Sequence, residues 1–417
     1  MKKLKNKIIL ILLLAFTLTS CNKEETEPLG KLIMEESDYA YLQEYYDLDL
    51  EKKSTVDVKG INESFETIFG EEAVKIEGDY SADKLIEVSI KNAQYEELAL
   101  TYNKDKVNEK LNNYYKVKVN SKNKNYLACA LDLGIVNSDI VKEIYKENKL
   151  DTDNFAYIIT RVINSTGVGR NCIGSIYDTD IGSKINNTWE SFLLFKDEKL
   201  EEVGYEAVKN GTVTGYNLKT SENDSNFIKD KTIVYGHSDI KHAHQLVGLL
   251  RSENIQAKIQ LEPKISIYKY LLEWGPVPEA SPTYEVVQDG EDYFVHAVEY
   301  DLAIEFLSED EMEKFNDIIE KYAKKNEGNE EAKGLLYESW WQPLYSTTNS
   351  NMNKEEYVEI VDNIVKNGIY EIHSFSTVED KEKVKAELTE NNDFESEQRT
   401  IYCNKAFYNY LIGEDYQ

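Results

Sequence analysis

The sequence predicts a protein of mixed helix and sheet, with a helical N-terminal domain followed by an α/β domain that contains β-α-β units and a β-hairpin. Two observations predict this order. Apolar residues recur at helical spacing between about 61 and 170. From 231 onward, short apolar or alternating runs are separated by helical segments. At 417 residues, the chain is also long enough for more than one hydrophobic core.

Residues 1–20 have the layout of an export signal. Four lysines lie within the first seven residues, and an apolar run follows from Ile8 to Leu18. That run is shorter than the roughly 20 residues of a membrane-spanning helix. It ends in Leu18-Thr19-Ser20-Cys21, which resembles the lipobox of bacterial lipoproteins.

The lipobox resemblance implies cleavage before Cys21 and a diacylglyceryl thioether on its sulfur. Acyl chains of the palmitate type would then hold the protein in the lipid bilayer, at the outer, extracytoplasmic face of the cell membrane. The alternative is an ordinary signal peptide with a chance cysteine. Residues 21–60, rich in Glu, Lys and Asp, are expected to form an acidic tether with one helix around Leu32 to Tyr46.

Three helices are expected between 61 and 170. They begin at a Ser81 cap, near Asn125 and near Thr152. The second ends in Leu133-Gly134-Ile135, and the third carries Phe155, Ile158, Ile159 and Val162 on one face.

The stretch from Tyr126 to Val162 resembles an S-layer homology module, which has a helix ending in a Leu-Gly-Ile turn, then a loop and a second helix. The resemblance implies a scaffold that binds pyruvylated wall polysaccharide through an arginine in the motif that opens the second helix. Here the corresponding stretch is Leu150-Asp151-Thr152-Asp153-Asn154, with an acid in place of that arginine. The scaffold is therefore expected to carry over, while this departure leaves the family's ligand open.

Residues 171–417 are expected to form the α/β domain, with 171–230 as irregular strands and loops. Strands at 232–235 and 257–261 flank a helix at 238–250, which predicts a β-α-β unit within a mixed sheet. Asp289-Gly290 predicts a hairpin turn between strands at 284–288 and 291–300. Further expected elements are helices from Ser308, at 353–368 and at 376–388, and strands at 369–375 and 395–402.

The acidic charge excludes one class of partner. The formal charge is −29, and removal of the leader with its four lysines takes it to −33. Such a field repels phosphate backbones, so nucleic acid is not expected as a partner. Cys129 lies in an apolar run and is interpreted as a buried thiol, while a disulfide between Cys172 and Cys403 is left open.

Candidate ligand-binding residues fall into two groups. His237 follows a strand and precedes a helix, where open α/β sheets place ligands. His242 and His244 are two residues apart on a helix and cannot share one metal from one face, so no metal or other cofactor is assigned. The aromatic candidates adjoin turn residues and could provide flat platforms for sugars or a partner protein; they are Trp274, Trp340, Trp341 and Tyr345.

No catalytic residue is assigned, because nucleophile-elbow, phosphate-loop and zinc-protease motifs are absent from the sequence.

These observations favour a non-enzymatic, membrane-anchored binding module for a cell-wall glycan or a surface protein. One alternative is a solute-binding lipoprotein of a transporter. The other is a wall-directed hydrolase centred on His237.

Overall fold

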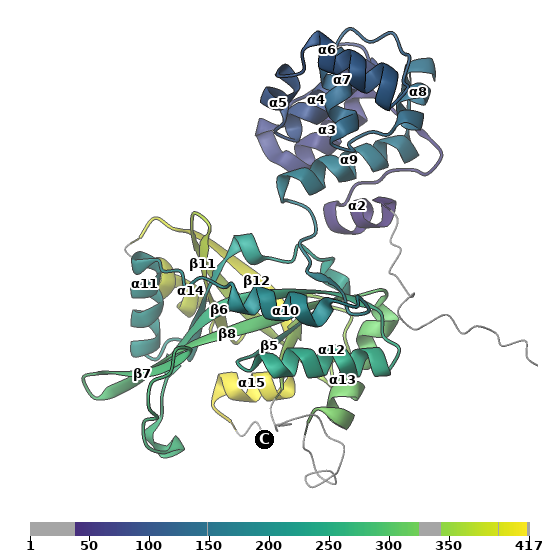
Figure 1. The fold of residues 1–417 in the computed structure, drawn as a ribbon. Helices are drawn as coiled ribbons and strands as arrows, with labels where there is room; N and C mark the ends of the chain where they lie inside the picture. The colour runs from purple at the N-terminus through teal and green to yellow at the C-terminus, as the bar shows by residue number, and fades with distance from the viewer. Residues whose placement is uncertain (1–37, 148, 325–342, 391, 415–417) are drawn as a thin grey trace, which may run out of the picture.

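The computed structural model describes residues 38–147, 149–324, 343–390 and 392–414. Within these ranges, the chain forms a helical domain and a larger domain built on a β-barrel, with α2 near their junction (Figure 1). The expected helical N-terminal region and the expected mixture of helix and sheet are confirmed. None of the helices in these ranges combines the length and the apolar character that crossing a membrane requires.

The helical domain consists of short helices and one two-stranded ribbon. Its helices are α2 (Asp38–Tyr46), α3 (Val58–Phe69), α4 (Ala82–Asn92), α5 (Glu96–Leu100), α6 (Lys104–Asn108), α7 (Lys124–Asp132), α8 (Ser138–Glu147) and α9 (Thr152–Thr166). A 3₁₀ turn (Gly70–Glu72) follows α3, and a π-helical turn (Glu109–Tyr114) follows α6. Strands β1 (Thr55–Val56) and β2 (Leu150–Asp151) pair antiparallel, immediately before α3 and α9.

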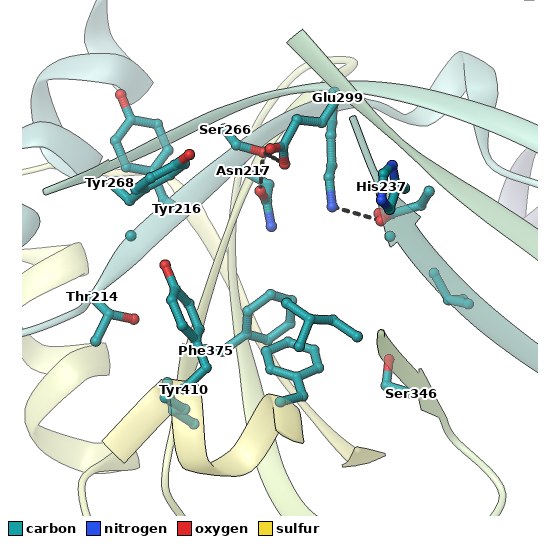
Figure 2. A pocket seen from close by; sticks show the side chains of 18 of the residues that line it. Thr214, Tyr216, Asn217, His237, Ser266, Tyr268, Glu299, Ser346, Phe375 and Tyr410 are labelled. Atoms are coloured by element: carbon teal, nitrogen blue, oxygen red, sulfur yellow. Dashed lines mark hydrogen bonds and ion pairs between the residues drawn. The ribbon is translucent and has the colours of Figure 1, made fainter. Parts of the chain in front are cut away.

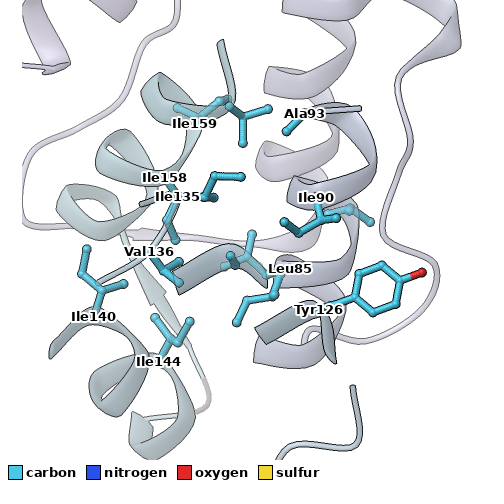
Figure 3. Close-up of a cluster of buried hydrophobic side chains, with 14 of the residues drawn as sticks. Leu85, Ile90, Ala93, Tyr126, Ile135, Val136, Ile140, Ile144, Ile158 and Ile159 are labelled. Carbon is cyan, nitrogen blue, oxygen red and sulfur yellow. The ribbon is translucent and has the colours of Figure 1, made fainter. Parts of the chain in front are cut away.

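The core of this domain is built from aliphatic side chains on several helices (Figure 3). Ser81 caps α4 by accepting a hydrogen bond from the Lys84 amide at 3.3 Å, as the sequence predicts. After α7, Gly134 adopts a φ of +69°, which favours glycine, and the chain turns so that Ile135 enters the core. Cys129 is fully buried on α7, which confirms the interpretation of its thiol.

The second domain contains the remaining strands and helices. Its strands are β3 (Gly174–Ser175), β4 (Gly215–Thr220), β5 (Thr232–His237), β6 (Ala257–Lys269), β7 (Tyr284–Asp289), β8 (Asp292–Phe306), β9 (Leu344–Thr347), β10 (Tyr357–Asn367), β11 (Tyr370–Ser376) and β12 (Glu395–Asn404). Its helices are α10 (Ile181–Glu190), α11 (Glu198–Lys209), α12 (Ile240–Ser252), α13 (Glu309–Tyr322), α14 (Lys381–Thr389) and α15 (Lys405–Ile412), and short 3₁₀ turns cover Ser221–Asn223, Lys229–Lys231 and Leu272–Trp274.

Eight of these strands form a closed antiparallel barrel in the order β6-β4-β11-β10-β12-β9-β5-β8, with β8 pairing back onto β6. Strand β3 adds to β6 outside this ring, and β7 adds to β8. The predicted hairpin forms between β7 and β8, but its turn is one residue later than expected: Asp289 pairs with Asp292, so the two loop residues are Gly290, at a φ of +62°, and Glu291.

Strand alternation divides each barrel strand between two environments. On β6 and β8, apolar residues such as Leu261 and Leu302 face outward and pack under α12 and α13. On the other side of the barrel, α11 and α14 cover the apolar residues of β4 and β11, among them Leu218 and Ile372. The inward positions of these strands are largely polar or charged, and they form the interior described below.

The predicted α/β domain with a β-α-β unit is wrong in its strand pairing. Strands β5 and β6 do run on either side of α12, but β8 lies between them and pairs antiparallel with both. The segment β5-α12-β6-β8-α13-β9, with strand order β9-β5-β8-β6, is therefore a split β-α-β arrangement. The observed pairings are all antiparallel in the described residues, so the predicted mixed sheet is replaced by an antiparallel barrel.

Other sequence expectations also change. The helix expected at 353–368 is strand β10, and the region 171–230 contains α10, α11 and β4 in addition to loops. The helix expected from Ser376 begins at Lys381. The cysteines left open as a disulfide pair are both free, with Cys403 buried and Cys172 exposed.

Helix α2 connects the two domains through side-chain contacts. The expected tether at 21–60 includes α2, β1 and the first residues of α3, and its residues 21–37 lie outside the described ranges. Tyr41 donates a hydrogen bond to the Asn226 carbonyl at 3.3 Å, and the Arg170 guanidinium lies 4.0 Å from the centre of the Tyr41 ring. On its other side, Asp38 pairs with Arg161 of α9 at 2.6 Å. The first described helix thus holds the barrel and the helical domain together.

Candidate functional site

The barrel interior contains two neighbouring cavities, which we name chamber A and chamber B. Chamber A has a volume of about 500 Å³, and chamber B about 260 Å³. Five residues line both chambers, so the two meet at the middle of the barrel; these are Asn217, Val234, Asp301, Ser346 and Phe375. A cavity the size of chamber A matches the usual range of small-molecule sites in proteins.

One wall of chamber A is polar (Figure 2). The Ser266 hydroxyl lies 2.7 Å from Glu299 and 2.8 Å from the Asn217 side chain. With a single proton, Ser266 donates to one of these oxygens at a time. In the part of the chain that the structure describes, Glu299 has no cationic partner, so its carboxylate remains an acceptor for a ligand hydroxyl or amine.

The opposite wall of chamber A is aromatic. Phe375 of β11 and Tyr410 of α15 face the chamber from this side, while Tyr268 lies on β6 beside Ser266, at the edge of the polar wall (Figure 2). Helix α15 contributes Phe407 and Leu411 to the same wall and packs across β9, β10 and β12. Burial, followed by the nearby Glu299 carboxylate, raises the pKa of Tyr268, so its hydroxyl stays protonated. The chamber therefore offers ring faces opposite hydrogen-bonding groups.

His237 lies at the end of β5 and lines chamber A. Its Nδ1 accepts a hydrogen bond from the Asp239 amide at 2.8 Å, which fixes the proton of the neutral ring on Nε2. Burial and the neighbouring His242 ring lower the pKa of His237 to about 4. Near neutral pH, His237 is therefore a hydrogen-bond donor through Nε2 and a weak general base.

A row of buried charges separates the two chambers. Lys264 lies 2.6 Å from Asp301, and Lys219 lies 3.2 Å from Asp301 and 2.8 Å from Glu262. Burial alone would raise the pKa of Asp301, but the Lys264 and Lys219 ammonium groups outweigh it and lower the pKa to about 2. The Lys219 pKa is raised, because Glu262 and Asp301 outweigh the effect of its burial. Asp301 and Lys219 therefore keep their charges across the physiological pH range.

Chamber B is lined by a second charged group on β10 and β11. His373 Nδ1 lies 2.9 Å from Asp362, and its Nε2 lies 3.3 Å from Glu371. Burial would lower the pKa of His373, but the Asp362 carboxylate and then Glu371 raise it to about 9. Both ring nitrogens therefore donate, and His373 is an imidazolium inside the barrel. Tyr45 of α2 also lines this chamber, at the end that faces the helical domain.

Only part of the predicted site lies in this interior. His237 lines chamber A, and Tyr345 borders it from β9, although the Tyr345 ring packs in the core against Phe315 and Tyr357. Trp274 ends a 3₁₀ turn after β6, and only its backbone is described. Cys21, Trp340 and Trp341 lie outside the described residues.

The other residues that line the chambers were missed because polar alternation on a strand normally indicates a solvent-facing side. On β6 the alternate positions are Gln260, Glu262, Lys264 and Ser266, and all four are buried. Their alternation with apolar residues was the available signal. The polar side of β6 faces the interior only because the sheet closes into a barrel. In the described ranges, no three side chains among His, Cys, Asp and Glu are placed to hold a metal ion.

Comparison of the chain with protein-family models, with curated proteins and with solved structures finds no significant match.

Proposed function

We propose that this protein is a lipid-anchored binding protein of the bacterial cell envelope that takes a small polar ring, such as a sugar unit, into chamber A. The observation that carries the proposal is the opposition of two walls within one cavity of about 500 Å³. One wall holds the hydrogen-bonding groups of Asn217, Ser266 and Glu299, and the other holds aromatic rings (Figure 2). A sugar ring has hydroxyls at its edge and apolar C–H faces, which suit these two walls.

An internal chamber favours a solute or a chain end over a flat protein partner. The groups available to a neutral ligand include the Glu299 acceptor. A hydrolase centred on His237 is less favoured, because a histidine with a pKa of about 4 is a poor base near neutral pH. The binding hypothesis needs only the hydrogen-bonding groups and aromatic rings that line chamber A.

The binding proposal is tested by calorimetric titration of the full-length protein, purified in detergent, with a panel of neutral and amino monosaccharides and disaccharides. For a sugar that binds, Glu299→Gln should weaken affinity by about tenfold or more, because it removes a charged hydrogen-bond acceptor. Tyr410→Leu should also weaken it, through loss of ring contact. Glu285→Gln on β7, where the side chain is exposed, is the matched control and should leave affinity unchanged.

A panel without any binder, or a binder whose affinity neither chamber variant changes, would remove the proposal for chamber A. The anchor is tested separately. Cys21→Ala should leave the protein unprocessed or release it from membranes, and continued membrane attachment of a correctly processed variant would contradict the lipobox interpretation.

We also propose that the helical domain contributes contact with the cell wall. The Leu133-Gly134-Ile135 turn after α7 and the strand-to-helix entry at α9 support the resemblance to S-layer homology modules. Asp151 caps α9 by accepting from the Asn154 amide at 2.8 Å, and Asp153 is exposed on its first turn. An exposed acid repels an anionic pyruvylated ligand, so the proposed glycan is neutral. Retention of the protein on purified wall, with and without its secondary polysaccharide, tests this contact.

A further inference from the structure

Chamber B differs from chamber A in being dominated by charge. Five carboxylates line it, and four of them are paired with buried or half-buried cations. These pairs are Glu262 with Lys219, Asp301 with Lys219 and Lys264, Asp362 with His373, and Glu371 with His373 and Lys366. The fifth carboxylate, Asp224, makes no hydrogen bond or ion pair through its side chain to any described residue.

Asp224 therefore lies at the chamber wall without a direct partner among the described residues, and the Lys219 and His373 cations offset its charge only in part. Its burial, followed by the Glu262 carboxylate, raises the pKa of Asp224 to about 6. The Asp224 side chain is therefore ionised in most molecules at pH 7. Arg399, which also lines chamber B, pairs with Glu397 at 3.3 Å. A half-buried anion without a direct partner is costly, and a bound cation is one way for a protein to offset that cost.

A second observation places another acceptor in the same cavity. Asp362 lines chamber B and is only 5% exposed. Its Oδ2 is used by His373, but Oδ1 has no hydrogen-bond partner among the described residues. A buried carboxylate oxygen in this position normally has a protein, water or ligand donor. Chamber B thus presents two carboxylates with unused acceptor capacity.

Aromatic rings complete the chamber. Tyr45 reaches it from α2 and stacks on Tyr41 at a ring separation of 5.2 Å, while Phe227 and Phe375 line it from the barrel domain. Ring faces attract cations, and the attraction grows when water is excluded. A metal ion is a poorer fit than an organic cation, because no group of three suitable ligands exists in the described ranges.

We propose that chamber B binds a small organic monocation through a primary ammonium group, with Asp224 as its counter-ion and Asp362 Oδ1 as a second acceptor. An ammonium group has three donors and one positive charge, which suits these two carboxylates. The cavity of about 260 Å³ restricts the remainder of the ligand to a few atoms against the rings. This site is separate from the proposed sugar site, because the charge row of Lys264 and Asp301 stands between them.

The test is calorimetric titration of the full-length protein in detergent at pH 7.5, with n-propylammonium chloride as the probe and n-propanol as its uncharged counterpart. Titrations in about 150 mM NaCl and in the same concentration of KCl suppress non-specific attraction to an acidic protein. We expect saturable binding of n-propylammonium in both salts and none of n-propanol. Asp224→Asn, which keeps the shape but removes the charge, should weaken that binding by at least about tenfold.

Two further variants separate this inference from its alternatives. Asp230→Asn removes an exposed acid of the following 3₁₀ turn and should leave n-propylammonium binding unchanged. Glu299→Gln alters chamber A alone and should also leave it unchanged, so failure of the sugar proposal does not affect this result. The inference is overturned if n-propylammonium fails to bind, if n-propanol binds equally well, if Na⁺ or K⁺ abolishes binding, or if folded Asp224→Asn protein binds as tightly as the parent.

Discussion

The Lys264 ammonium lies 2.6 Å from the Asp301 carboxylate inside the barrel, at the level where chambers A and B meet. Both side chains are almost completely buried, and Asp301 also accepts from Lys219 at 3.2 Å. The carboxylate therefore compensates two buried ammonium groups. Removing it leaves the two ammonium groups without this counter-ion in an interior that water reaches poorly, which destabilises the folded protein.

We accordingly expect Asp301→Asn to lower the free energy of unfolding by about 3–5 kcal/mol, as measured by urea denaturation. Asp289→Asn is the matched control. It removes an acid from an exposed ion pair with Lys209 at 2.8 Å, and asparagine keeps the shape of this last residue of β7, which pairs with Asp292. The control should change stability much less. Equal losses in the two variants would contradict a special role for the buried pair.

The imidazolium at His373 predicts a fall in stability on the alkaline side. Its pKa in the folded protein is about 9, raised from 6.5 by Asp362 and Glu371 against the effect of burial. A raised pKa means that the folded state holds the proton more tightly. The resulting stability is fully present below about pH 6.5 and is lost as the pH rises toward 9.

The loss between pH 6.5 and 9 should reach up to about 3 kcal/mol in the free energy of unfolding, measured by urea denaturation at intervals of half a pH unit. His373→Gln should flatten the curve in this window. His244→Gln, on half-exposed His244 of α12, should retain the slope. A parent protein with constant stability from pH 6.5 to 9 would show that His373 is neutral when folded.

Local signals predicted many elements but not the way they assemble. The β7-β8 hairpin, the cap at Ser81 and the capped helix at Ser308 follow from side chains adjacent in the sequence, and each is present, although the hairpin turn is one residue later than predicted. Strands β5 and β6 with α12 between them were also recognised. Their pairing through β8 depends on residues between 25 and 73 positions away, which sequence periodicity does not register.

The segment 353–368 shows how a local signal misleads. Asn353 and Glu356 have the spacing of a helix cap, and Ile360, Val361 and Ile364 fit a helical face. In the structure, Asn353 hydrogen-bonds to the Glu355 amide and the Glu356 side chain in a turn, and the β-branched residues form β10. Asparagine starts turns and helices by the same kind of hydrogen bond, so neighbouring strands decided the outcome.

Two helical glycines should respond oppositely to the same substitution. An added Cβ at Gly204 of α11 would lie 2.7 Å from the Tyr216 ring, which is buried under that helix. At Gly248 of α12, the same Cβ would meet no atom within 4 Å. Gly204→Ala should therefore lower the free energy of unfolding by about 1–3 kcal/mol through overpacking. Gly248→Ala should raise it by about 0.5–1 kcal/mol, because alanine favours the helix.

Thermal denaturation of both glycine variants checks this pair, and the opposite signs provide an internal control. Stabilisation by Gly204→Ala would mean that the packing of α11 on β4 adjusts easily, contrary to the tight contact with Tyr216.

The junction between the two domains depends on Arg170. Its Nε lies 2.7 Å from Glu305, which is 1% exposed, and its guanidinium stacks on the Tyr41 ring of α2. Arg170→Met would keep much of the side-chain length while leaving Glu305 buried without this cation. We expect a loss of about 3–5 kcal/mol in the free energy of unfolding and faster proteolysis near α2.

Arg161 provides a closely matched comparison for the junction. It also pairs with an acid of α2, Asp38, at 2.6 Å and stacks on a tyrosine, Tyr157, but its pair is about one-third exposed. Arg161→Met should cost about 1 kcal/mol or less, because water solvates the partner that remains. Urea denaturation and limited proteolysis of the two variants therefore separate burial from the mere presence of an ion pair. Similar behaviour of both variants would show that α2 is held to the barrel mainly by its apolar contacts.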